Sequence, residues 1–200
     1  PLFRSLEDML NTQGRPTLDD YDDYLFAVLK MIDYDAQSRQ LDHEQVSLVI
    51  RPNLVISLQE KPGDVFDPVR DRIRKGKGRI RKAGADYLAY ALMDMIVDHY
   101  FTILEQIGEQ MESLQEAVFQ DPGSQIVETI HHSRSQMIFL RRAAWPTREI
   151  IQALLREESD LISGDVRLYL RDVYDHTVHV ADTVDTYRDI LSGVLDIYLS

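Results

Sequence analysis

Three long segments of the chain repeat apolar residues in alternating steps of four and three, and this pattern constrains the fold more than any other feature. The segments cover residues 86–119, 125–158 and 165 onwards. Such spacing places one apolar stripe along a helix and is typical of long helices that pack side by side, as in coiled coils. These stripes, called seams below, consist in chain order of Met93, Val97, Tyr100, Leu104, Ile107, Met111, Leu114 and Val118; of Ile126, Ile130, Ser133, Met137, Leu140, Ala144, Thr147, Ile151 and Leu154; and of Val166, Leu170, Val173, Thr177, Val180, Val184, Tyr187, Leu191, Val194 and Tyr198.

Turn-forming residues separate these segments and predict three distinct helices. "DPGS" interrupts the first pattern after residue 120, and "SDLISGD" interrupts the second after residue 158. Pro146 stands in the middle of the second helix. Because proline has no N–H to donate, we expect the helix to bend there.

The first 85 residues lack this pattern. A short helix is predicted over residues 2–11, because Gly14 and Pro16 follow it. Three strand-like runs rich in Val, Ile, Leu and Tyr follow at 24–34, 45–53 and 54–61, with a tight-turn signal, "RPN", between the last two. A short helical piece is expected around 69–74. We therefore predict an α+β fold, in which a partial α/β domain with antiparallel strands (α-β-α sandwich-like) precedes long coiled-coil-like helices.

The charges of the chain argue against nucleic acid as a partner. The chain has 22 Lys and Arg against 34 Asp and Glu, a net charge of −12. Eight of those bases lie in one run, "RDRIRKGKGRIRK" at 70–82, so the remainder is strongly acidic and should attract cations. The run has no interleaved aromatic residues. A solvated linker, or a partner for acids elsewhere in the protein, is therefore favoured over a nucleic-acid site.

The third helix carries a column of aspartates away from its seam. They occupy heptad position f at Asp175, Asp182, Asp189 and Asp196, and position c at Asp165 and Asp172. Residues seven apart lie about 10 Å apart along a helix axis, whereas Mg²⁺ holds its oxygen ligands at about 2 Å. A metal site on this column therefore needs a second element facing it; otherwise the column is a solvated face. Hard oxygen ligands favour Mg²⁺ or Ca²⁺ over Zn²⁺.

Other kinds of site have less support. His176 and His179 lie three apart beside Asp172 and Asp175 and could hold a transition metal, but this spacing also arises by chance on any helix. The absence of Cys excludes thiolate sites and disulfides. No phosphate-binding loop, dinucleotide fingerprint or nucleophile elbow occurs. We therefore expect no catalytic residues and no enzyme.

Several long, collinear strings resemble one known family. "RDVYDHTVHVADTVDTYRDILSGVLDIYLS" at 171–200 resembles the stalk segment of the CorA family of magnesium channels, which precedes the first pore-lining stretch. "ADYLAYALMDMIVDHYF", "LVISLQEKPGDVFDPVRDRIR", "RRAAWPTRE" and the opening "LEDMLN" resemble the regions before it. The resemblance covers essentially the whole chain.

The resemblance implies a domain organisation, an assembly and a location. Residues 1–85 correspond to part of a cytoplasmic α/β domain, 86–160 to a helical hairpin called the willow helices, and 161–200 to the stalk helix leading towards the pore. Family members are homopentamers in the cell membrane, with this part soluble on the cytoplasmic face. The transmembrane helices, the Gly-Met-Asn selectivity motif and the first part of the sheet are absent here. We therefore expect a fragment that reaches the membrane only through the missing helices.

The resemblance also implies metal sites between subunits, where carboxylates of one subunit's α/β domain face the stalk of its neighbour. Matched motif by motif, the ligands are Glu7 and Asp8 of "LED", Asp94 of "ALMD", Asp98 one turn later, and Asp172 of "RDVYDH". The main site is expected on Asp8 and Asp172, and a second on Glu7, Asp94 and Asp172.

The sequence thus predicts the Mg²⁺-sensing regulatory domain of a CorA-type channel, whose ligand is Mg²⁺, Co²⁺ or another divalent cation. Cations bound between carboxylates would stabilise a closed pentamer. Two alternatives stay open. A zinc-transporting member of the same superfamily would depend on His99, His176 and His179, and a coiled-coil scaffold would have no metal role.

Overall fold

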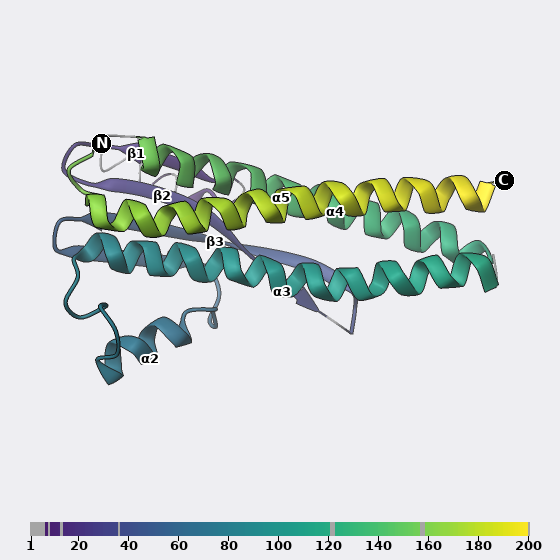
Figure 1. Cartoon of the computed structure of the whole chain (residues 1–200), viewed down its shortest axis with the longest axis horizontal. Coiled ribbons are helices and arrows are strands. Elements are labelled where there is room, and N and C mark those ends of the chain that lie inside the picture. The colour runs from purple at the N-terminus through teal and green to yellow at the C-terminus, as the bar shows by residue number, and fades with distance from the viewer. Residues whose placement is uncertain are drawn as a thin grey trace.

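The computed structural model describes residues 7, 9–12, 14–35, 37–120, 123–156 and 159–199, and within them it confirms the predicted α+β fold. Four strands form one antiparallel sheet in the order β1-β2-β3-β4, followed by helices α2 to α5 (Figure 1). The elements are β1 (Thr17–Asp20), β2 (Leu25–Asp35), β3 (Gln40–Arg51), β4 (Leu54–Gln59), α2 (Asp67–Lys75), α3 (Ala85–Gln120), α4 (Ser124–Arg156) and α5 (Gly164–Leu199).

The sheet has one strand more than the sequence predicted. Strand β1, with the sequence TLDD, pairs with β2 from Thr17↔Val28 to Asp20↔Leu25. A single Leu beside two acids gives no alternation of apolar and polar residues, so the strand had no local signal. Strand β3 also begins earlier than predicted, at Gln40, because its polar first part continues the pairing with β2.

Two further predictions concern the ends of this region. The tight turn between β3 and β4 is confirmed by the pairing of Arg51 with Leu54. Of the helix predicted over residues 2–11, Glu7, Met9 and Leu10 are helical, whereas residues 2–6 and 8 lie outside the described part of the chain.

The three long helices run along the long axis of the molecule, with α4 antiparallel to α3 and α5 (Figure 1). Every predicted seam position of α3 and α4 is buried, and in α5 only Tyr187 and Tyr198 are partly exposed. Helix α4 stays helical through Pro146, and beside it the Thr147 hydroxyl donates to the Ala143 carbonyl at 2.9 Å. The heptad patterns therefore identified the packed faces correctly.

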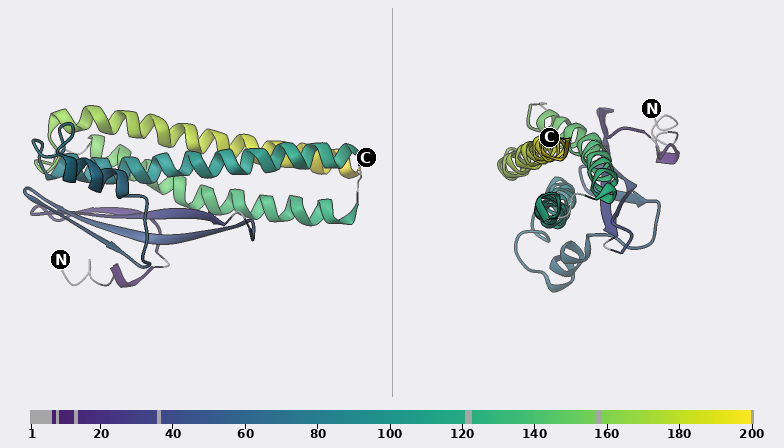
Figure 2. Two further views of the ribbon diagram at one scale, coloured as in Figure 1. Left: turned by 90° about the horizontal axis from the view of Figure 1, so that it is seen from below. Right: turned by 90° about the vertical axis from the view of Figure 1, so that its right-hand side faces the viewer.

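The sheet and the helices share one hydrophobic core. Helices α3 and α4 pack on the sheet, and one cluster of buried residues continues from β2 and β3 into all three long helices. Only the ends of these helices on the side away from α2 extend beyond the sheet (Figure 2). The division at residues 85 and 160 into three domains stays a prediction.

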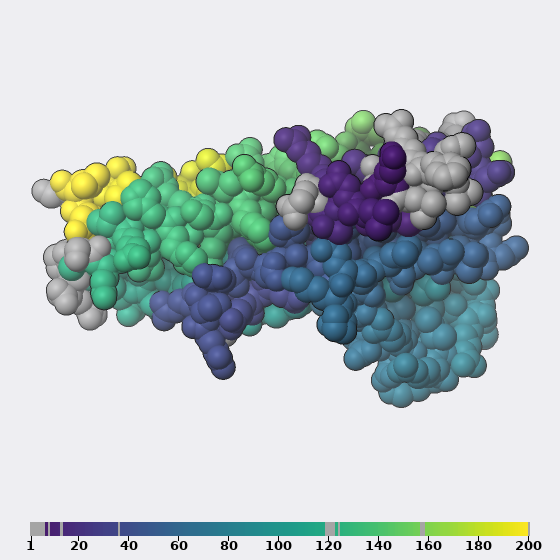
Figure 3. Space-filling model, turned by 180° about the vertical axis from the view of Figure 1, so that it is seen from behind, coloured from purple at the N-terminus to yellow at the C-terminus, as the bar shows by residue number. Residues whose placement is uncertain are grey.

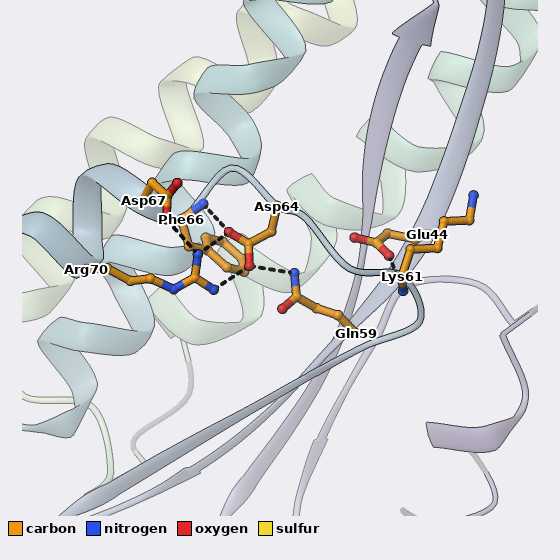
Figure 4. A network of polar contacts seen from close by, with 7 residues as sticks. All are labelled: Glu44, Gln59, Lys61, Asp64, Phe66, Asp67 and Arg70. Atoms are coloured by element: carbon orange, nitrogen blue, oxygen red, sulfur yellow. Dashed lines mark hydrogen bonds and ion pairs between the residues drawn. The ribbon is translucent and has the colours of Figure 1, made fainter.

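Asp64 ties the connection after β4 to helix α2 (Figure 4). Its carboxylate accepts both terminal N–H groups of the Arg70 guanidinium, the Phe66 backbone N–H at 2.8 Å and the Gln59 side-chain amide at 3.1 Å. These bonds, above all those from Arg70, hold the pKa of Asp64 below its usual range. The first base of the basic run thus neutralises a carboxylate that is only 6% exposed.

Asp64→Asn should lower the free energy of unfolding by about 1–3 kcal/mol near pH 7, because it removes charge-assisted hydrogen bonds. A depressed folded-state pKa gives stability that is present above the unfolded pKa and lost as pH falls through the folded pKa. Urea unfolding should therefore show that the difference in unfolding free energy between the variant and the parent becomes smaller in acid. Asp67→Asn is the matched control: Asp67 contacts the same Arg70 but is 83% exposed, so its loss should cost little. A gap that does not change with pH would contradict this account.

Gly108 of α3 faces the Tyr187 side chain of α5, which leaves no room for a Cβ at this position. A Cβ at this position would lie 2.6 Å from the Tyr187 hydroxyl, which donates to the Leu104 carbonyl at 3.2 Å. Gly108→Ala should therefore destabilise the parent, although alanine has the higher helix propensity. In a Tyr187→Phe background the nearest atom is an ordinary contact at 3.5 Å. There the same change should stabilise by up to about 1 kcal/mol in urea unfolding. Effects of the same sign in both backgrounds would refute the steric explanation.

Candidate metal site between α3 and α5

Three side chains with metal-binding atoms meet between α3 and α5. Asp94 and Asp98 lie one turn apart on α3, and His176 lies on α5; one ligand atom of each is within 4.8 Å of the other two. We call these three residues the acid–histidine group. Across the described ranges, no other three His, Asp or Glu side chains come this close together.

The group forms because its members flank the seams. Asp94 follows the seam residue Met93, and His176 precedes the seam residue Thr177. When two seams pack, the positions beside them line the edge of the contact and face each other. Asp98 lies one helical turn beyond Asp94 and so stays at the same edge.

Neighbouring side chains orient the group. His176 Nδ1 lies 3.4 Å from an Asp98 oxygen, and the Phe101 ring meets the His176 ring edge to face at 5.6 Å. The Tyr90 hydroxyl donates to Asp94 at 3.3 Å. The Asp98 and His176 side chains are 48% and 47% exposed, so solvent reaches them.

Asp94 bears an uncompensated electrostatic cost. Burial raises the pKa of Asp94, and the charge of Asp98 raises it further. The hydrogen bond from Tyr90 and the nearby His176 and Arg72 oppose this shift without cancelling it. Like charges one turn apart on a helix also destabilise it. A cation held between the two carboxylates would remove both costs.

The donor set fits a hydrated divalent cation. Octahedral Mg²⁺ holds its ligands at 2.0–2.1 Å, which separates opposite ligands by about 4.1 Å. Separations up to 4.8 Å therefore need a small side-chain movement or one bridging water. Two carboxylates suit Mg²⁺, and the imidazole adds affinity for Co²⁺ or Zn²⁺.

The other predicted ligands do not join this group. Glu7 is exposed beside the N-terminus of the described chain, and Asp172 is exposed one turn before His176 on α5. Asp8 lies outside the described residues. The pairing of Asp8 with Asp172 and the use of Glu7 with Asp94 involve a neighbouring subunit, so they stay predictions.

Sequence reasoning missed the partnership of His176 with the two aspartates. His176 was considered with His179 beside Asp172 and Asp175, and with His99 for a zinc transporter, but not with Asp94 or Asp98. His179 contacts the Phe101 ring at 5.4 Å. Seam spacing within one helix does not specify its register against another helix. The available signal was that Asp94 and His176 both flank seam positions.

Comparison with known proteins supplies the family. Residues 3–200 match the family described as CorA-like Mg²⁺ transporter protein. The chain is 48% identical over 195 residues to the cobalt/magnesium transport protein CorA of Thermotoga maritima, covering 98% of this chain and 56% of that protein. It is 21% identical over 192 residues to the protein of the same name from Methanocaldococcus jannaschii, covering 96% and 60%. The chain thus spans less than two thirds of either relative.

Solved structures show the same fold at lower identity. The soluble domain of CorA from Methanocaldococcus jannaschii matches with a TM-score of 0.85 at 20% identity, covering 98% of this chain and 78% of that one. The cytoplasmic domain of ZntB from Vibrio parahaemolyticus matches with a TM-score of 0.79 at 16% identity, covering 96% and 75%. No helix in the described ranges has the length and apolarity needed to cross a membrane. The family match over nearly the whole chain and the 48% identity to a full-length relative show that this chain belongs to the CorA family.

Proposed function

We propose that this chain is the cytoplasmic, cation-sensing part of a CorA-type channel for Mg²⁺ or Co²⁺. The observation that carries the proposal is the acid–histidine group, in which burial and a second carboxylate raise the pKa of Asp94. A group that is destabilised when empty gains stability on binding a cation. Because the chain belongs to a family of Mg²⁺ transporters, we propose Mg²⁺ or Co²⁺ as that cation.

Sensing follows from electrostatics. A bound cation would cancel the repulsion between Asp94 and Asp98 and hold α3 against α5. In a homopentamer of acidic subunits, further cations between Glu7 or Asp8 of one subunit and Asp172 of the next would hold the ring closed. Mg²⁺ loses its waters reluctantly and is held by few carboxylates, so binding is weak and suits a plentiful ion. Binding and closure are linked. The factor by which bound cation favours the closed ring therefore equals the factor by which closure raises the affinity for the cation.

The zinc alternative has one specific observation in its favour, the imidazole of His176 in the group. The other two histidines of that alternative lie elsewhere: His99 is 3.3 Å from Asp33, and His179 contacts Phe101. A group with one histidine and two carboxylates is a less suitable zinc site than one with several nitrogen ligands.

A thermal melt against Mg²⁺, Co²⁺ and Zn²⁺ tests the proposal. A cation at ten times its Kd should stabilise by about 1.4 kcal/mol, which raises the melting temperature by roughly 3–5 °C for a chain of this size. Asp98→Asn should abolish most of that gain. Asp182→Asn is the matched control, since Asp182 is an exposed α5 aspartate outside the group.

Three results separate the hypotheses. Loss of the Mg²⁺ gain in Asp98→Asn but not in Asp182→Asn supports sensing at this group. Stabilisation by micromolar Zn²⁺ without any by Mg²⁺, lost in His176→Gln, supports the zinc alternative. No response to any cation, with an oligomeric state that light scattering shows to be independent of cations, supports the scaffold. Adding Asp172→Asn to the scattering series tests the proposed contact between subunits.

Asp94→Asn should stabilise the metal-free protein. The raised folded-state pKa of Asp94 means that the parent loses stability as pH rises from the unfolded pKa through the folded one. Asparagine has no charge to bury, so in EDTA at pH 7 the variant should melt higher, by roughly 2–4 °C for each kcal/mol of repulsion removed. The difference should shrink in acid, where Asp94 is protonated. A variant that melts lower than the parent in EDTA at pH 7 would show that Asp94 carries no such cost.

A further inference from the structure

A cavity of about 690 Å³ opens between α4 and the sheet, and none of its lining residues belongs to the acid–histidine group. Its walls come from the segment before β1, from β2 and β3, and from the second half of α4. On the face shown in Figure 3, the residues around β1 (purple) lie beside α4 (green), in agreement with the contacts between these elements.

The cavity is lined by positive charge in an otherwise acidic protein. Arg15 precedes β1, Lys30 comes from β2, and Arg141 and Arg142 come from α4, whereas Glu149 is the only acid among the lining residues. The chain as a whole has a net charge of −12. Among the ion pairs of the described residues, none involves any of the three arginines. The local field of the cavity is therefore suited to an anion.

Lys30 contributes a buried charge. Its side chain is 6% exposed, and its ammonium donates to the Thr12 carbonyl at 2.6 Å and to the Gln45 side-chain oxygen at 3.3 Å. Both acceptors are neutral, and burial lowers the pKa of Lys30 although nearby Glu60 opposes this. A buried cation with neutral partners gains from a counter-charge. An anion in the cavity would supply one.

Aromatic rings hold the cationic wall in place. The Arg141 guanidinium lies 4.7 Å from the centre of the Trp145 ring, and the His43 ring meets the Phe139 ring at 5.0 Å. A guanidinium stacked on an aromatic ring keeps its edge N–H groups free to donate in a fork that matches phosphate oxygens. Stacking therefore orients Arg141 at little entropic cost.

We propose that this cavity binds a small polyphosphate anion. Its phosphate oxygens would accept hydrogen bonds from Arg141, Arg142 and Arg15 at the rim and take their charge compensation from Lys30 below. Arginine binds phosphate in a bidentate manner, and several converging cations call for a ligand with more than one negative charge. The volume lies in the range of about 300–1,000 Å³ that is usual for small-molecule sites. The polyphosphate is either inorganic or attached to an organic group such as a nucleoside.

Trp145 makes a direct test simple, because it is the only tryptophan of the chain and it lines the cavity. Its fluorescence should change saturably when inorganic pyrophosphate or tripolyphosphate is added to the metal-free protein. The variants Arg142→Gln and Arg15→Gln should each weaken binding by about tenfold, as expected for loss of a charge-assisted phosphate contact. Tighter binding of ATP than of tripolyphosphate would identify a nucleoside polyphosphate as the ligand, and equal binding would identify the polyphosphate group alone.

Arg148→Gln is the matched control. Arg148 lies on α4 with its guanidinium 5.7 Å from the Trp145 ring, but it does not line the cavity. Its loss removes the same charge and should weaken binding by less than about threefold. The proposal is overturned if sulfate at equal ionic strength gives the same fluorescence change, or if Arg148→Gln weakens binding as much as Arg142→Gln does. Circular dichroism melts show whether a variant that has lost the signal is unfolded. If it is, the charge-preserving double variant Arg15→Lys, Arg142→Lys takes its place. This double variant should still bind the polyphosphate, but more weakly; unchanged affinity would contradict the proposed bidentate contacts.

Discussion

The packing of α5 along both α3 and α4 is the interaction on which the rest of the structure depends. Helices α3 and α4 contact each other only sparsely, whereas each packs extensively on α5. Five of the nine buried residues of α5 are Val, whose short side chains let neighbouring helices approach closely. Without α5, the seams of α3 and α4 would lack most of the surface on which they pack. The three helices therefore depend on one another for their stability.

The same packing sets the register that creates the acid–histidine group. Tyr187 of α5 reaches the Leu104 carbonyl beside Gly108, and His176 of α5 reaches Asp98. In a parallel pair of helices these contacts belong to one alignment, because Gly108 follows Asp98 by ten residues on α3 and Tyr187 follows His176 by eleven on α5. The site therefore inherits its geometry from the core. The burial of the two seams also offsets the electrostatic cost of Asp94 in the protein without a cation.

The sequence predicts those features that depend on residues close together in the chain, and not those that depend on contacts between distant segments. The seams, the breaks between the helices and the turn at Pro52 and Asn53 depend on residues close together in the chain, and the structure confirms them. Strand β1 exists only because β2 offers it a partner, so its four residues carry no signal of their own. The partnership of His176 with Asp94, and the convergence of Arg15, Lys30 and Arg142 on one cavity, depend on which distant segments meet. Periodicity within a segment contains no information about that.

The two proposed sites have opposite charge and lie at different contacts within the fold. The acid–histidine group lies where α3 meets α5, and the cationic cavity lies where α4 meets the sheet. Their proposed ligands, a divalent cation and a polyphosphate, also bind each other in water, so a rise in free polyphosphate lowers the free cation. Polyphosphate would thus empty one site as it fills the other. Since α5 packs on both α3 and α4, any difference in helix packing between these two liganded states would couple the sites, and linkage requires that coupling to act equally in both directions.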